Sequence, residues 1–138
     1  MLKHVSFVTP DAGRIARFYA ALGASVTKDL VTSEGWRRLV LSFEGGGRLQ
    51  FFEVQAAQEP PIILDHPNHP APASPVGAPH SWMEHVAVVV PDLTALAERL
   101  RQDGVPFSRE LGLSPTGKPM AFVLDPDGRQ VELLEAEG

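Results

Sequence analysis

The sequence predicts an α+β fold in which two paired βαβββ modules form a cupped mixed sheet around a central cleft. The main observation is an internal repeat. A histidine, an apolar run and Pro-Asp occur at 4–11 and again, 81 residues later, at 85–92. Further along the chain, 49–53 aligns with 131–135 at an offset of 82 residues. A repeat of this length indicates one supersecondary unit used twice, and each copy needs a partner to cover its apolar face.

The first copy predicts one helix and four strands. Alternating apolar residues over 2–8 are typical of a half-buried strand. Asp11 is placed to cap a helix, and Gly23 stands where a left-handed C-terminal cap belongs. We expect the other three strands at 24–30, 36–43 and 48–54.

The second copy repeats this order. A strand is expected at 84–90, and a helix follows that Asp92 caps and Gly104 ends. Three more strands are expected at 105–111, 120–124 and 130–134. The intervening stretch is rich in proline, alanine and histidine, which favours an irregular connection. We therefore interpret 1–138 as a single domain with module 1 at about 1–55, a proline-rich connection at about 56–81 and module 2 at about 82–138.

Composition excludes several classes of function. The chain has 12 basic and 17 acidic residues, a net charge of −5 and no basic block, so we expect no nucleic-acid partner. It contains no cysteine, which rules out disulfides and thiolate chemistry. No apolar run is long enough to span a membrane and no signal pattern is visible, so we expect a cytoplasmic protein without a membrane partner. We expect a homodimer that acts on a small-molecule substrate, with modules paired within one chain or exchanged between two chains.

Four polar residues occupy matching places in the repeat. His4 and His85 lie near the start of each first strand, and Gln50 and Glu132 lie in each last strand. If the modules pair about a pseudo-twofold axis, these side chains converge in the common cleft. Two imidazoles with oxygen donors suit a divalent first-row metal and leave positions open for substrate. Glu53 is a competing carboxylate, but strand alternation places it opposite Gln50 unless a bulge intervenes, which favours Gln50.

These motifs resemble the vicinal oxygen chelate superfamily, which includes glyoxalase I, methylmalonyl-CoA epimerase, extradiol dioxygenases, fosfomycin-resistance enzymes and bleomycin-binding proteins. The resemblance covers nearly the whole chain outside the connection and is strongest at the Asp-Pro-Asp-Gly turn and the strand after it, 125–133. It implies metal ligation by His4, His85 and Glu132, with Gln50 in fourth place. Bacterial glyoxalase I commonly has Glu in that place, whereas the epimerases have Gln. The resemblance also implies that Glu132 acts as the catalytic base.

The leading hypothesis is a metal-dependent isomerase or lyase of the glyoxalase or epimerase type. A divalent ion (Zn, Ni, Co, Mn or Fe) would hold two neighbouring substrate oxygens and stabilise an enediolate or enolate. An extradiol-type ring-cleaving dioxygenase is an alternative, because two histidines and one carboxylate also form an iron-binding triad. A third is a metal-free protein that binds a drug or small metabolite, as bleomycin-resistance proteins do.

Other polar residues have weaker assignments. The histidines of the connection have no fixed ligand geometry, and we interpret them as solvated loop residues: His66, His69 and His80. Three arginines are candidates for binding an anionic substrate, although solvation is the commoner role for such side chains: Arg37, Arg38 and Arg109.

Overall fold

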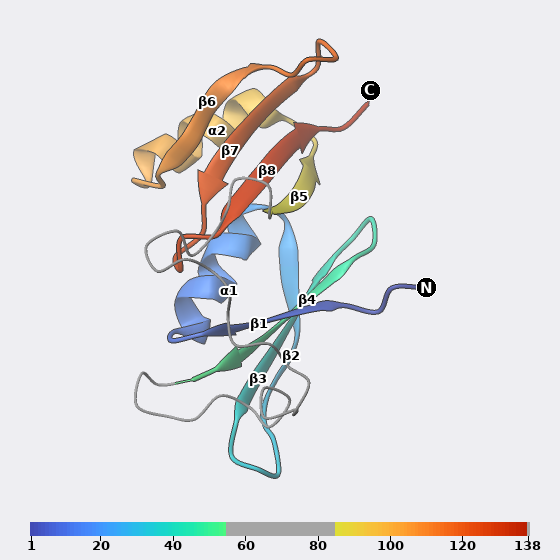
Figure 1. The fold of residues 1–138 in the computed structure, drawn as a ribbon, viewed down its shortest axis with the longest axis vertical. Helices are drawn as coiled ribbons and strands as arrows, with labels where there is room; N and C mark the ends of the chain where they lie inside the picture. The colour runs from blue at the N-terminus through green and yellow to red at the C-terminus, as the bar shows by residue number, and fades with distance from the viewer. Residues whose placement is uncertain (55–84, 138) are drawn as a thin grey trace, which may run out of the picture. The chain divides into compact units, whose positions relative to one another are not determined.

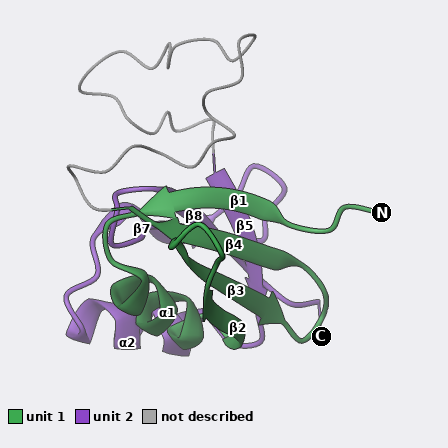
Figure 2. Cartoon of the chain, turned by 90° about the horizontal axis from the view of Figure 1, so that it is seen from below, with its two compact units in different colours: residues 1–73 green, residues 74–138 purple. Residues whose placement is uncertain are grey.

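A computed structural model describes residues 1–54 and 85–137 of the chain (Figure 1). The chain divides into two compact units, unit 1 (Met1–Ala73) and unit 2 (Ser74–Gly138), which Figure 2 distinguishes by colour. Each unit contains one helix and a four-stranded mixed sheet, which confirms the predicted α+β fold of two βαβββ modules. The predicted connection lies outside the described residues. Neither described helix is long and apolar enough to cross a membrane.

Unit 1 runs through its elements in the predicted order. They are β1 (Val5–Thr9), α1 (Ala12–Ala21), β2 (Ala24–Val31), β3 (Arg37–Phe43) and β4 (Arg48–Glu53). The sheet order is β1-β4-β3-β2, so the first strand lies beside the last. β1 is parallel to β4, and the other pairs are antiparallel hairpin neighbours. This crossover brings the N-terminal histidine segment next to the strand that carries Gln50.

Unit 2 has the same topology. Its elements are β5 (His85–Val90), α2 (Leu93–Gln102), β6 (Phe107–Leu113), β7 (Pro119–Leu124) and β8 (Gln130–Glu135). The sheet order β5-β8-β7-β6 again places the first strand beside the last, in parallel. Val5 pairs with Leu49 in unit 1, and Val86 pairs with Val131 in unit 2. The strand registers therefore match the offsets of 81 and 82 found in the sequence.

The helix ends follow the predicted local chemistry. The Asp11 side chain accepts a hydrogen bond from the amide of Arg14 at 3.0 Å, and Asp92 does the same for Ala95 at 3.0 Å. These bonds satisfy amides that have no partner inside the helix. The glycines that follow the two helices have φ values of 101° (Gly23) and 78° (Gly104), a region in which side chains with a Cβ are disfavoured.

Two predicted strand boundaries are wrong. The strand predicted at 105–111 begins at Phe107, because the Val105 amide donates to the Leu100 carbonyl at 2.9 Å and so belongs to the end of α2. The strand predicted at 2–8 begins at Val5, because its partner strand β4 begins at Arg48 and the chain before that residue forms a turn.

Each helix covers one face of its own sheet. In unit 1 the Tyr19 ring packs against Phe51 with centroids 5.7 Å apart, and Leu39 and Leu41 are fully buried on the same face. Strand alternation then directs Ser6, Arg38, Val40 and Gln50 to the opposite face, which we call the helix-free face of unit 1. In unit 2 the face beneath α2 buries Ala121, Val123, Val131 and Leu133. Its helix-free face carries His85, Phe122 and Glu132.

Candidate functional site

The structure brings His85 and Glu132 together on the helix-free face of unit 2. His85 is the first residue of β5, and Glu132 pairs with Ala87 two residues further along that strand. The imidazole Nε2 lies 3.0 Å from Glu132 Oε2, and the side chains are 29% and 18% exposed. The Phe122 ring meets the imidazole edge to face with centroids 5.2 Å apart. The pair is thus supported from within its sheet and still reachable by solvent.

In unit 1 the matching position is held by an amide rather than a carboxylate. Gln50 is only 6% exposed. Its Oε1 accepts a hydrogen bond from Arg38 Nε at 2.6 Å, and its Nε2 donates to Ser6 Oγ at 3.1 Å. His4 lies immediately before β1, half-buried and two residues from Ser6. Gln50 is therefore positioned by two neighbours on its own face of the sheet.

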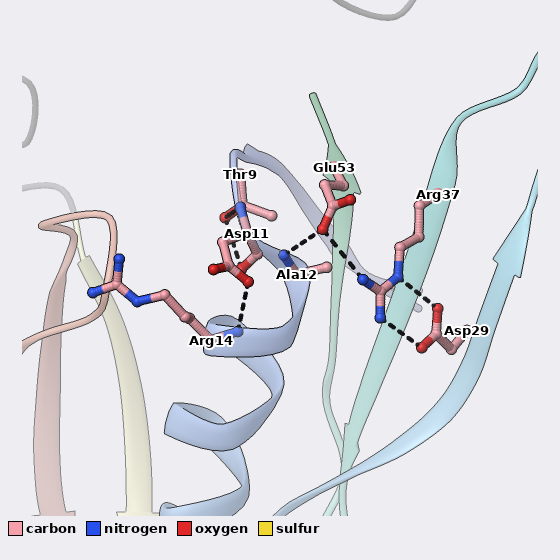
Figure 3. Close-up of polar contacts among 7 residues, drawn as sticks. All are labelled: Thr9, Asp11, Ala12, Arg14, Asp29, Arg37 and Glu53. Carbon is pink, nitrogen blue, oxygen red and sulfur yellow. Dashed lines mark hydrogen bonds and ion pairs between the residues drawn. The ribbon is translucent and has the colours of Figure 1, made fainter. Parts of the chain in front are cut away.

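Glu53 lies on the other side of the sheet, where it caps a helix. Its Oε2 accepts from the Ala12 amide at 2.8 Å and from Arg37 Nη1 at 3.2 Å (Figure 3). No register shift interrupts the pairing of β4 with β1 or β3, so no bulge turns Glu53 towards Gln50. The alternation expected from the sequence is confirmed for these two side chains.

The equivalent carboxylate of unit 2 has the same structural role. Glu135 Oε1 accepts from the Leu93 amide, the first of α2, at 3.0 Å. The glutamate that ends each repeat is therefore a helix-capping group, supplied by the last strand to the helix beside it. Negative charge is favourable at a helix N-terminus because the amide dipoles point their positive ends there.

In unit 1 the capping residue Glu53 also bonds Arg37, which forms an ion pair with Asp29. Arg37 reaches Asp29 through Nε and Nη2, each at 3.0 Å, and Figure 3 shows the guanidinium between the two carboxylates. The hydrogen bonds from Arg37, and then its charge, hold the pKa of Asp29 below the ordinary value of 3.8. Arg37 therefore bonds two acidic side chains, Asp29 and Glu53, on the helix side of the sheet.

The predicted donors fall into two groups, one in each unit. His4 and Gln50 belong to unit 1, and His85 and Glu132 belong to unit 2. Within residues 1–54 and 85–137, no group of three His, Asp or Glu residues gathers in a way that could hold a metal ion. The joint site of all four therefore stays a prediction. His66, His69 and His80 lie outside the described residues.

Two contacts of Gln50 were not predicted from the sequence. Ser6 and Arg38 hold the two ends of its amide. The sequence carried one signal for these contacts, the alternation of side chains along a strand. Once β1, β3 and β4 are placed, this alternation puts Ser6 and Arg38 on the helix-free face with Gln50. Alternation alone does not give the register of two paired strands, so it does not identify Arg38 as the partner of Gln50.

Comparisons with known proteins agree with this fold. A family model described as the Glyoxalase/Bleomycin resistance protein/Dioxygenase superfamily matches residues 1–133. A lactoylglutathione lyase of Salmonella typhimurium is 43% identical over 54 residues, which are 38% of this chain and 40% of that relative's length. A solved glyoxalase family protein from Enterococcus faecalis is 25% identical with a TM-score of 0.67, covering 98% of this chain and 97% of its own. A bleomycin resistance determinant encoded on transposon Tn5 is 19% identical with a TM-score of 0.59, covers 100% of this chain and 99% of its own, and shares the fold alone.

Proposed function

We propose that this chain, which belongs to the Glyoxalase/Bleomycin resistance protein/Dioxygenase superfamily, is a metal-dependent isomerase or lyase of the glyoxalase or epimerase type. The observation that carries the proposal is the contact of 3.0 Å between His85 Nε2 and Glu132 Oε2. Because these two side chains already face one another, both can bind the same ion with little rearrangement. In the proposal, His4 and Gln50 complete the donor set.

The donor chemistry fits a divalent first-row ion. Two neutral imidazoles and one carboxylate form a common ligand set for such metals, and an amide oxygen is an acceptable weaker donor. The fit is less direct at Gln50, because its oxygen already accepts from the Arg38 guanidinium at 2.6 Å. Ligation by Gln50 would therefore use the second lone pair of the same oxygen. His85 Nε2 and Glu132 Oε2 lie 3.0 Å from one another, so ligation would replace that contact, whereas His4 has no such competitor among the described residues.

The proposed chemistry is proton transfer next to a carbonyl. A divalent ion held by His4, Gln50, His85 and Glu132 would supply positive charge to two neighbouring substrate oxygens, which would stabilise negative charge that forms there. Glu132 is the catalytic base in this proposal: its Oε atoms accept the proton from the substrate carbon and return it to a neighbouring position. Before an ion binds, His85 orients that carboxylate through the hydrogen bond at 3.0 Å. Phe122 packs against the imidazole and restricts its rotation.

The test combines metal content with isotope exchange. Protein purified without chelator is analysed for bound metals, alongside His4→Ala, His85→Ala and His66→Ala, the last being a histidine outside the proposed set. We expect one ion per donor set in the parent and in His66→Ala, and loss of the ion in the other two variants. Solvent deuterium is then followed at the carbon next to a hemithioacetal or thioester. A parent protein without metal, or ligand variants that keep it, would contradict the proposal.

A second experiment tests whether the four proposed donors come from one chain or from two copies. Two donors from each unit converge either within one chain or between two copies in the predicted homodimer. Sedimentation velocity with and without metal distinguishes these arrangements: exchange between copies ties metal binding to the dimer, whereas pairing within a chain leaves the monomer able to bind.

A metal-free binding protein is a second candidate, and one specific observation favours it. The guanidinium of Arg38 takes one of the two acceptor positions of the Gln50 oxygen, and its positive charge opposes a nearby divalent ion. Under this alternative, purified protein binds a small ligand stoichiometrically and stays inert with every metal added. The deuterium experiment separates the two functions, because only the first predicts exchange.

A further inference from the structure

Arg38 is the candidate arginine that lies beside the proposed donor set. Arg37 is matched by two carboxylates on the helix side of the sheet. Arg109 is exposed and, among the described residues, reaches a backbone carbonyl alone, at 3.4 Å. Arg38 instead lies half-buried on the helix-free face of unit 1, with Nε bonded to the oxygen of Gln50. The structure thus separates three arginines that the sequence left equivalent.

Among the described residues, the charge of Arg38 has no acidic partner in its own sheet. Strands β1 to β4 contain two carboxylates, Asp29 and Glu53, and both bond Arg37. The helix-free face adds a further positive charge at Lys28, which pairs with Val40 beside Gln50. A neutral amide does not compensate a guanidinium, so this face favours an anion.

The Arg38 guanidinium also keeps unused donors. Its Nε is taken by Gln50, and within the described residues neither Nη1 nor Nη2 donates a hydrogen bond. A guanidinium presents its donors in a planar fork that matches the two oxygens of a carboxylate. Because Arg38 is half-buried, a carboxylate bound there is partly shielded from water, which strengthens a charge-assisted hydrogen bond.

We propose that Arg38 is a specificity-determining residue that binds a carboxylate of the substrate. This inference rests on the proposed function, because Gln50 is its link to the reacting atoms. The contact of 2.6 Å between Arg38 and Gln50 places the guanidinium beside the proposed ligand. The carboxylate therefore lies within a few bonds of the chelating oxygens rather than at the far end of a long carrier. The substrate class is a small oxygenated acid.

The experiment compares two hydroxamates of equal length by calorimetry on the Zn²⁺-loaded protein. Succinic acid monohydroxamate and butyrohydroxamate offer the same pair of chelating oxygens, but only the first carries a carboxylate, in place of a methyl group. We expect the parent protein to prefer the carboxylate probe by about tenfold or more, the range of one charge-assisted bidentate contact. Arg38→Gln removes this preference: its affinities for the two probes become equal, whatever the change in the affinity for butyrohydroxamate.

Two further variants keep the test specific. Arg38→Lys preserves the charge without the fork, so it retains part of the preference. Arg17→Gln removes an exposed arginine from α1, which covers the opposite face of the sheet, and the preference stays at the parent value. Melting temperatures of all variants verify that the fold is intact. Suberic acid monohydroxamate, whose carboxylate is several bonds further away, shows no Arg38-dependent gain.

The outcomes distinguish this inference from the proposed function. Equal affinity for both short probes, or a preference that survives in Arg38→Gln, would overturn the role of Arg38 and leave the metal-dependent function standing. If neither probe binds the metal-loaded protein, the proposed function fails and this inference fails with it. If the carboxylate probe binds equally well without metal and only when Arg38 is present, recognition of the acid stands and metal-dependent catalysis does not.

Discussion

The two units share one topology but differ at the centre of the last strand. Unit 2 has Glu132 there, bonded to an imidazole, whereas unit 1 has Gln50, bonded to a guanidinium and a hydroxyl. The residues at the ends of the same strands do not differ in this way, because Glu53 and Glu135 both cap the neighbouring helix. The repeat thus preserves the groups that build each module and varies the groups that face away from the helix. This contrast supports the proposal that the chemistry takes place on the helix-free faces.

The largest effect is expected from making unit 2 resemble unit 1. Glu132→Gln replaces the only carboxylate of the proposed donor set by a near-isosteric amide, which keeps a hydrogen bond to His85 and cannot act as a base. Loss of a general base lowers rates by about 10²–10⁴-fold. We expect solvent deuterium exchange to fall by that factor with no change in melting temperature. Gln50→Glu is the matched control in unit 1, and an equal loss there would remove the distinction between the units.

Much of this arrangement was predictable because strand alternation and local capping are encoded within a few residues. Asp11, Asp92, Gly23 and Gly104 act through contacts inside one or two turns, so their roles followed directly from their positions. The position of Glu53 on the helix side of the sheet followed from the alternation of side chains along β4.

Contacts that depend on register did not follow from the sequence. Arg38 reaches Gln50 diagonally across two strands, and a shift of β3 by one residue would have turned Arg37 to the helix-free face instead. Register is fixed by the hairpin between β3 and β4 and by the apolar residues under α1 together. Local patterns therefore predict which residue type lies on a face, but not which side chain it contacts.

The hairpins before the last strands give the second comparison. In unit 2 Asp125 is buried, its Oδ1 accepts from the amides of Asp127 and Arg129 at 2.9 Å each, and its Oδ2 lies 3.2 Å from the Arg129 guanidinium. In unit 1 three successive glycines form the equivalent turn, and two of them have φ near 100°. One turn is held by a side chain and the other by backbone freedom.

Removing that side chain is expected to be the largest stability effect. Asp125→Ala leaves the amides of Asp127 and Arg129 without their acceptor and leaves Asp127 as the carboxylate beside the Arg129 guanidinium, so we expect a loss of about 2–4 kcal/mol in the free energy of unfolding. Glu44→Ala, an exposed position in the glycine turn of unit 1, changes it by less than about 0.5 kcal/mol. Urea titration measures both. Similar values for the two variants would mean that the Asp125 contacts do not stabilise the turn.

A comparison of Glu53 with Glu135 separates the stabilisation that comes from helix capping from the stabilisation that comes from the ion pair with Arg37. Glu53→Gln weakens bonds to both a helix amide and Arg37, so we expect a loss of about 1–2 kcal/mol. Glu135→Gln weakens only the amide bond, because Pro119 stands where Arg37 stands in unit 1, and we expect about 0.5–1 kcal/mol. Urea titration is again the measurement. In an Arg37→Met background the two losses should become equal, and a persistent difference would assign the excess to something other than the ion pair.

The smallest expected effect comes from Asp29, whose ion pair with Arg37 has no counterpart among the described residues of unit 2. Arg37 lowers the pKa of Asp29 in the folded state from its ordinary value of 3.8, so the folded state binds its proton less readily than the unfolded state. The resulting stabilisation is present above that ordinary value and is lost as pH falls through the lower folded-state pKa. Because both side chains are more than a third exposed, we expect less than about 1 kcal/mol. Asp29→Asn should therefore be slightly less stable than the parent at pH 7 and lose the disadvantage at pH 2, as measured by urea titration at each pH. A difference that stays constant down to pH 2 would show that the carboxylate stabilises unit 1 by packing rather than by charge.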